Sequence, residues 1–238
     1  MTDALSLDRN VNRASFRSAV VLILTAAASL FFPLDAPEGP LAERMLWFSS
    51  NIDLFVIGWV IQMIAMLTLS GVFAGTAWQI RKTHPVRTFV ASTALLISVV
   101  AFIIPKFIAI WSIPQMVASS ATVSKDSAAA EQLLQLLNPS LSFSLFTSFD
   151  YLGFWMYAVF GLLVARPLLR LTLSAKIAAV GLGLYGLLYH LLLVGVMTGR
   201  VASADIGGYA ESIAALLLVS VISMAVFFRR AMKANAGA

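Results

Sequence analysis

Six long apolar runs alternate with short polar segments along the chain. Each run reaches the roughly 17–25 residues that cross a hydrocarbon core about 30 Å thick, and two runs exceed that length. The runs are apolar around the whole circumference of a helix, whereas a helix of a soluble protein carries one apolar stripe. We therefore predict an all-α, polytopic transmembrane helix bundle that forms a single domain over residues 1–238. The predicted spans cover residues 17–34, 54–80, 88–117, 141–165, 176–198 and 211–228.

The first run also has features of a secretory signal peptide. Basic residues, the last of them Arg17, precede it, and small residues lie near its end at Ala26 to Ser29. A signal peptide combines these features with a cleavage site. We expect this run to be retained as a membrane helix.

The basic residues predict the orientation, because Lys and Arg accumulate in the cytoplasmic loops of membrane proteins. With the N-terminus inside, the four inner segments hold three basic residues each, and together they account for twelve of the 16 in the chain. We therefore expect both termini to be cytoplasmic. The twelve are Arg9, Arg13, Arg17, Arg81, Lys82, Arg87, Arg166, Arg170, Lys176, Arg229, Arg230 and Lys233.

The composition supports a membrane protein and excludes several other classes. Only 11% of the residues are charged, against about 25% in soluble domains, so lipid must cover most of the surface. The net charge of +5 falls in short clusters between apolar runs, without the basic face that nucleic-acid binding requires. We expect no nucleic-acid partner.

The chain offers few groups for a metal or cofactor. It has no cysteine and two histidines, His84 and His190. Disulfides, thiolate zinc sites, Cys-ligated iron–sulfur clusters and cysteine nucleophiles are therefore excluded. No Walker-type loop, His-Glu-x-x-His or Gly-x-Ser-x-Gly motif is present. We predict no metal and no cofactor.

Four predicted spans each hold one ionisable residue at a similar distance from the inner end of the span. These residues are Lys106, Asp150, His190 and Glu211. A rise of about 1.5 Å per residue, counted from the basic inner end of each span, places them about 21–28 Å away, toward the outer side. Charged groups at such depth usually turn inward and pair. Lys106 and Asp150 form the expected first pair, and His190 and Glu211 form a second pair or join the same network. The predicted ligand- or ion-binding residues are Asp150, Lys106, Glu211, His190, Tyr189 and Tyr151.

Lys106, Glu211 and His190 can each be explained by a purely structural role. Asp150 is the hardest of the four to explain in that way. Lys106 follows Pro105 near the outer end of its span, so its side chain can extend to the interface. Glu211 begins a span, where the helix dipole favours a solvated carboxylate. His190 is compatible with an ordinary packing residue. Asp150 lies in an aromatic, apolar run, so we place it first among the candidates.

Three other features carry structural expectations. Asp53 is interpreted as a carboxylate at the outer start of a helix, and Ser127 as the cap of a short leucine-rich helix that ends at Asn138 and lies along the outer interface. Gly71 and Gly75 have the spacing that lets two helices approach closely. We favour packing within the bundle for these glycines over an oligomer contact.

The second half of the chain carries a resemblance. Phe149-Asp150-Tyr151-Leu152-Gly153-Phe154, then Phe160-Gly161, a short Arg-containing loop and a Gly-rich fifth span follow in order. This layout is similar to a family of bacterial six-helix membrane proteins of unknown function. The resemblance implies the topology and a bacterial inner-membrane setting, and it assigns no site residue.

Three functions are compatible with these features. The first is a non-enzymatic membrane protein that binds a lipid or small amphipathic molecule in an outer polar pocket, or that docks onto a membrane complex as an accessory subunit. The second is a proton- or ion-coupled secondary transporter, with a homodimer relaxing the objection that six helices are few. The third is an intramembrane enzyme that uses Asp150, Glu211 or His190 as acid or base. The sequence favours a non-enzymatic role.

Overall fold

The computed structural model describes residues 2–37, 39–120, 132–134, 136–138, 141 and 144–234, and within these ranges the chain is helical without strands. Six of its helical segments are long and apolar enough to cross a membrane, which confirms the predicted all-helical bundle at that level. The helices are α1 (Thr2–Ser29), α2 (Leu41–Ile80), α3 (Pro85–Phe107), the π-helix η1 (Ile108–Ser112), α4 (Ile113–Ser120), α6 (Leu145–Leu168), α7 (Leu173–Met197), the 3₁₀ helix η2 (Ser203–Asp205) and α8 (Ile206–Ala234).

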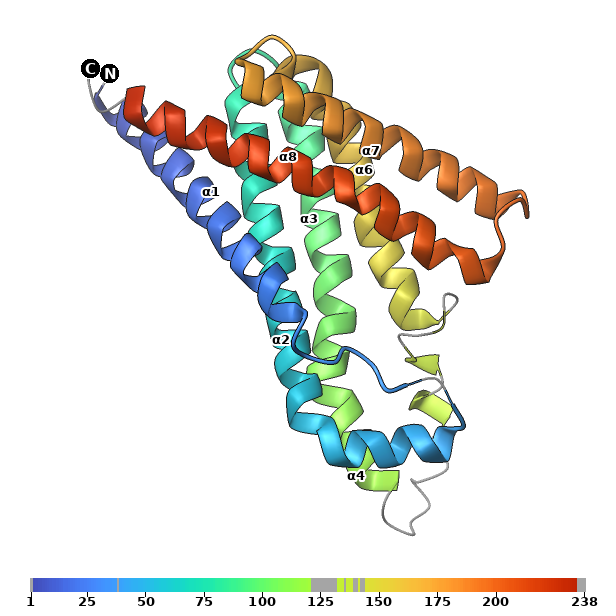
Figure 1. The fold of residues 1–238 in the computed structure, drawn as a ribbon. Coiled ribbons are helices and arrows are strands. Elements are labelled where there is room, and N and C mark those ends of the chain that lie inside the picture. The colour runs from blue at the N-terminus through green and yellow to red at the C-terminus, as the bar shows by residue number, and fades with distance from the viewer. Residues whose placement is uncertain are drawn as a thin grey trace.

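Two helices begin well before the predicted spans, because polar stretches continue the apolar helices. The helix α1 begins at Thr2, ahead of the span predicted from residue 17, and Asn12 and Ser15 in this added part are buried. The helix α2 begins at Leu41 after Pro40, so Asp53 is an exposed residue of its interior and not a helix start. The 40 residues of α2 do not form one straight rod. Its first part turns across the end of the bundle, and the rest runs along α1 and α3 (Figure 1).

The long helices form a closed ring. Each packs on the next in the order α1, α2, α3, α6, α7 and α8, and α8 returns to pack on α1. Figure 1 shows both chain ends, the α2–α3 turn and the α6–α7 turn at one end of the bundle. The hairpin of α7 and α8 leans away from α2 and α3 toward the other end. The two termini therefore share one side.

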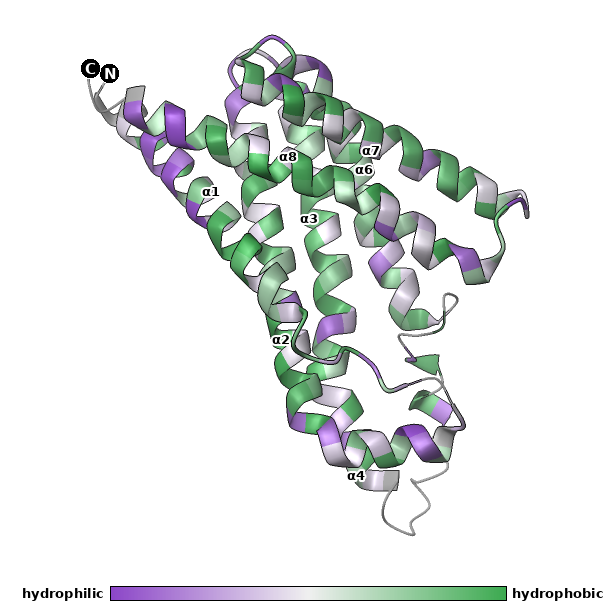
Figure 2. Ribbon diagram, viewed as in Figure 1, coloured by the Kyte–Doolittle hydropathy of each residue, from purple (hydrophilic) through white to green (hydrophobic). Residues whose placement is uncertain are grey.

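Aromatic side chains fill the ring near the shared end. The rings of Phe73 and Phe160 stack with centroids 5.0 Å apart, and Tyr157 meets Phe73 edge-on at the same distance. All three side chains are fully buried. Figure 2 shows apolar residues along the outside of the helices and hydrophilic residues mainly at their ends. The packed axis and apolar exterior are those of a bundle that lipid surrounds.

A second apolar cluster lies beyond the ring, where α2 and α3 extend farthest. It joins the first half of α2 to η1, α4 and the start of α6 through Phe55, Trp59, Ile113 and Phe146, all buried. From the predicted leucine-rich helix, the described residues 132–134 and 136 are helical, and Leu134 belongs to this cluster. The cap expected at Ser127 lies outside the described residues.

The buried guanidinium of Arg44 ties this outer part together. It donates hydrogen bonds to Asp35 at 2.7 Å, to the Ala36 carbonyl at 3.1 Å and to the Asn138 side chain at 2.9 Å. We expect Arg44→Met to destabilise the outer part by about 2 kcal/mol, because one buried and two partly buried acceptors lose a charged donor. Hydrogen exchange of residues 34–56 measures this loss. Unchanged protection there would contradict it, and Arg200→Met, at an exposed arginine, is the control.

The glycine pair of α2 packs within the chain. A Cβ atom built on Gly71 would lie 2.6 Å from the Ser18 hydroxyl oxygen, and one on Gly75 only 1.9 Å from that of Ser15. Both serines belong to α1, so this face of α2 is already occupied. The packing interpretation is confirmed for these two glycines.

Candidate functional site

A buried ion pair joins α3 to α6. The ammonium Nζ of Lys106 lies 2.7 Å from the carboxylate Oδ1 of Asp150, with 4% and 22% of the two side chains exposed. Lys106 is in the last turn of α3 and Asp150 in the second turn of α6. The pairing expected from their heights is therefore present.

The pair lies where the two apolar clusters meet. The Lys106 ammonium is 5.0 Å from the ring centre of Phe102, which belongs to the ring interior, and 5.6 Å from that of Trp59, which belongs to the outer cluster. Aromatic faces attract a cation at these distances. The rings thus stabilise a charge that burial would otherwise disfavour.

The backbone of α3 changes its hydrogen bonding next to Lys106. Pro105 has no N–H, so the helical bond to the carbonyl four residues earlier cannot form. Downstream, the chain widens into the π-helix η1, and its following residue Ile113 bonds to the Ile108 carbonyl. Single π turns inside α-helices occur often at functional sites. The ion pair is therefore placed beside an irregular stretch of an otherwise regular helix.

Hydroxyl groups hold α6 to its neighbours close to Asp150. The hydroxyl groups belong to α2, α3, α6 and α7, and in four of the five bonds the acceptor is a backbone carbonyl of α6 or α2. The Tyr189 hydroxyl donates to the backbone carbonyl of Tyr151, which links two of the predicted site residues. The bonds are Ser98 to Gly153 at 2.8 Å, Tyr185 to Phe154 at 2.9 Å, Tyr189 to Tyr151 at 3.2 Å, Tyr157 to Met66 at 3.4 Å, and Ser70 with the Tyr157 hydroxyl at 2.7 Å.

The structure does not bring His190 and Glu211 into this site. The Nδ1 atom of His190 lies 2.7 Å from its own helix at the Gly186 carbonyl, and Nε2 accepts a hydrogen bond from the Trp155 indole at 3.2 Å. This pattern fits a neutral imidazole with the proton on Nδ1. Glu211 is exposed on α8, which packs on α7 and α1. No ion pair links these two residues in the described part of the chain.

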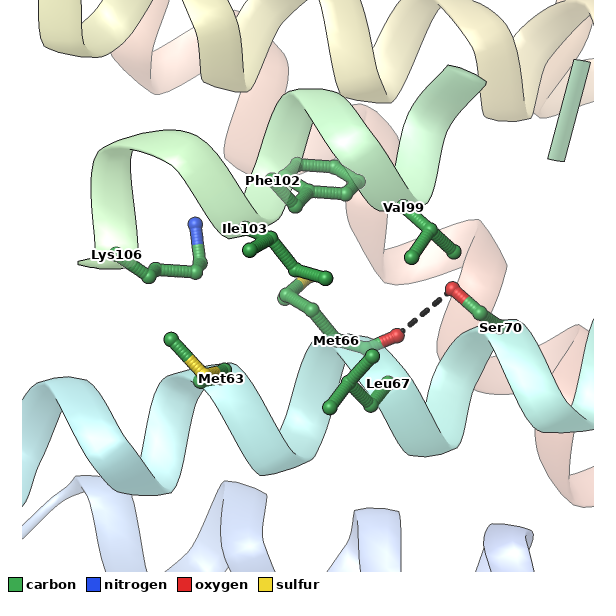
Figure 3. Close-up of a pocket in the computed structure, with 8 residues that line it drawn as sticks. All are labelled: Met63, Met66, Leu67, Ser70, Val99, Phe102, Ile103 and Lys106. Carbon is green, nitrogen blue, oxygen red and sulfur yellow. Dashed lines mark hydrogen bonds between the residues drawn. The ribbon is translucent and has the colours of Figure 1, made fainter. Parts of the chain in front are cut away.

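A narrow groove runs along the seam of α2 and α3 below the ion pair (Figure 3). It is open on one side and too narrow to hold a water molecule. The aliphatic stem of Lys106 lines one end, while its ammonium turns away from α2 (Figure 3). The Ser70 hydroxyl donates to the Met66 carbonyl at 2.9 Å. The lining residues are Met63, Met66, Leu67, Ser70, Val99, Phe102, Ile103 and Lys106.

Sequence reasoning missed the apolar residues of this groove. Met63, Met66 and Val99 lie within uniformly apolar spans, where every position has the same composition signal. The spacing of Met63 and Met66 places both on one helix face, which is the one available hint. The structure adds which face of α2 meets α3.

No family model, curated protein or solved structure matches this chain. In the described ranges, no three His, Asp or Glu side chains come together as metal ligands. The fold and its apolar exterior define the class, a bundle of six helices able to span a membrane. Its function is therefore argued from its own residues.

Proposed function

We propose that this chain is an integral protein of a bacterial inner membrane with both termini in the cytoplasm. The support is the distribution of positive charge over a bundle whose two termini and two short turns share one end (Figure 1). The four inner segments that carry three basic residues each map to that end. The positive-inside rule places such an end in the cytoplasm.

Within that membrane, the protein binds a lipid or small amphipathic molecule without chemical conversion. The observation that carries this proposal is the buried Lys106–Asp150 pair at the end of an apolar groove that opens to the bundle exterior. Two of the groove residues, Leu67 and Ile103, are 44% and 36% exposed on the side where lipid tails would lie. A single apolar chain can enter there directly from the bilayer.

The groove and the ion pair suit the two ends of such a ligand. An ammonium can donate three hydrogen bonds, and among the described residues Lys106 makes one, to Asp150. A carbonyl or carboxylate oxygen of the ligand would take another when the ammonium, which turns away from α2 in this conformation, rotates toward the groove (Figure 3). Met63 and Met66 supply flexible side chains that adapt to an apolar tail. Since the groove is closed to water in this conformation, binding requires these side chains to move apart.

The test is mass spectrometry of small molecules, lipids and proteins that co-purify from the membrane in mild detergent. We expect a specific amphipathic molecule to accompany the wild-type chain and to be lost by at least tenfold in Val99→Phe, which fills the groove. Val100→Phe is the matched control, because Val100 is 51% exposed on the same helix and does not line the groove. Equal retention in both variants would refute the groove as the site.

The same purification tests whether the protein is an accessory subunit of a membrane complex, and a transport assay tests whether it is an ion-coupled carrier. A protein that stays bound to both variants would indicate an accessory subunit of a membrane complex or, if it is a second copy, a homodimer. An ion-coupled carrier is the second candidate, favoured by the π-helix η1 beside the ion pair, since transporters bind their cargo at interrupted helices. Ion-coupled uptake by proteoliposomes, abolished by Asp150→Asn, would replace the binding proposal.

A further inference from the structure

The α2–α3 turn and the α6–α7 turn lie at the other end of α3 from Lys106 (Figure 1). Residues of both turns line a second pocket. Its volume is about 210 Å³, several times the roughly 30 Å³ share of a water molecule in the liquid. It therefore has room for a phosphate group. The lining residues are His84, Arg87, Arg166, Pro167 and Arg170.

The charge of this pocket has no counterpart within the described chain. Three arginines and one histidine line it, and none of them forms an ion pair with a described carboxylate. Asp8, an acidic residue of α1, is already bonded to Arg81, Lys82 and the indole of Trp78. The charge is therefore available to an anion from outside the chain.

The backbone adds to this positive field. The helix α3 starts at Pro85, its first turn holds no acidic residue, and His84 makes no side-chain cap. The first N–H groups of a helix lack intrahelical partners and carry a partial positive charge. His84 and Arg87 belong to this helix start and to the pocket, so both the side chains and the helix end favour an anion there.

We propose that this pocket binds the phosphate group of an anionic lipid. Guanidinium groups form paired, charge-assisted hydrogen bonds with phosphate oxygens. Exposed apolar residues adjoin the arginines in the chain, since Val86 beside Arg87 is 75% exposed and Leu169 beside Arg170 is 46% exposed. A charged floor next to apolar side chains suits a headgroup whose tails remain in the bilayer, and basic pockets between spans are known to hold such headgroups.

The site uses none of the residues of the groove, so the two proposals stand or fall separately. The test is native mass spectrometry of the full-length, delipidated protein titrated with cardiolipin, phosphatidylglycerol or phosphatidylcholine. We expect the two anionic lipids to bind at least tenfold more tightly than phosphatidylcholine. The double variant Arg87→Gln, Arg170→Gln should reduce their binding to the phosphatidylcholine level.

Two further variants separate specific recognition from overall charge. Arg87→Lys with Arg170→Lys keeps the charge and the inner count of basic residues but loses the paired geometry, so we expect a several-fold loss in a protein that still inserts normally. Arg229→Gln with Arg230→Gln removes the same charge from exposed positions of α8 and should leave binding unchanged. An equal loss in this control would overturn the proposal.

Inorganic phosphate distinguishes the two sources of a phosphate group. We expect millimolar phosphate to leave the bound lipid in place, because the lipid tails add affinity that the free ion lacks. Displacement of the lipid by phosphate at that concentration would show that the pocket binds a soluble phosphate and would overturn the proposal of a lipid ligand. Equal affinity for phosphatidylcholine and the anionic lipids would also overturn that proposal.

Discussion

Asp150→Asn is expected to lower the free energy of unfolding by about 3–5 kcal/mol, the usual cost of removing one partner of a buried ion pair. The substitution keeps the shape of the side chain but leaves the Lys106 ammonium, 4% exposed, without its counter-ion. The nearby rings of Trp59 and Phe102 offset part of that cost. Reversible unfolding in mixed micelles measures the change.

Paired substitutions show whether the cost comes from the unpaired charge. Replacing both partners, Lys106→Met with Asp150→Leu, should recover most of the lost stability, because apolar residues often substitute for a buried pair at no cost. Asp53→Asn and Glu211→Gln, at exposed carboxylates, should change stability by less than about 0.5 kcal/mol. If Asp150→Asn left the free energy of unfolding unchanged, water or lipid headgroups would have to solvate the Lys106 ammonium.

The double replacement also connects stability to function. Since an apolar pair would serve the fold equally well, a charged pair held at this depth is more readily explained by a bound ligand or ion. We therefore expect the double variant to fold and yet to lose the co-purifying molecule. That combination would separate the role of the ion pair in binding from its role in packing.

The position of a residue along its helix was predictable from the sequence. Helical rise and the basic inner ends place Lys106 and Asp150 at similar heights, and opposite charge then favours their contact. The same counting placed His190 and Glu211 nearby, and there it failed. Height says nothing of the direction in which a side chain points or of the tilt of its helix.

The tilt of a helix and the direction of its side chains depend on how the helices pack, and a uniformly apolar run carries no signal for that packing. The hairpin of α7 and α8 leans away from α2 and α3, and His190 bonds within its own helix and to Trp155. Polar stretches that continue a helix were also missed, as at Asp53, because hydropathy detects the membrane span and not the helix that exceeds it. The arginines of the basic pocket could be predicted to lie on the inner side, because they belong to the inner loops. The cavity itself could not be predicted, because it forms only where the α2–α3 and α6–α7 turns lie side by side.

The helices α6 and α7 pack closely at Gly161, and this contact gives the second large prediction. A Cβ atom on Gly161 would lie 2.5 Å from the backbone oxygen of Leu182, closer than real Cβ atoms approach other atoms. Gly161→Ala should therefore destabilise the protein by about 1–3 kcal/mol, and Gly161→Val by about 3 kcal/mol, since overpacking displaces the backbone. Unfolding in mixed micelles, as for Asp150→Asn, measures both.

Gly183 supplies a control on the same interface. A Cβ atom there would lie 3.4 Å from the Cβ of Ala165, an ordinary contact, so Gly183→Ala should be neutral or gain up to about 1 kcal/mol from helix propensity. If Gly161→Ala were equally neutral, α6 and α7 would have to lie farther apart than the structure shows.

Because Tyr189 of α7 bonds to the backbone beside Asp150, a shifted α7 would also weaken the surroundings of the ion pair. We therefore expect Gly161→Val, but not Gly183→Ala, to reduce the stability cost of Asp150→Asn when the two substitutions are combined.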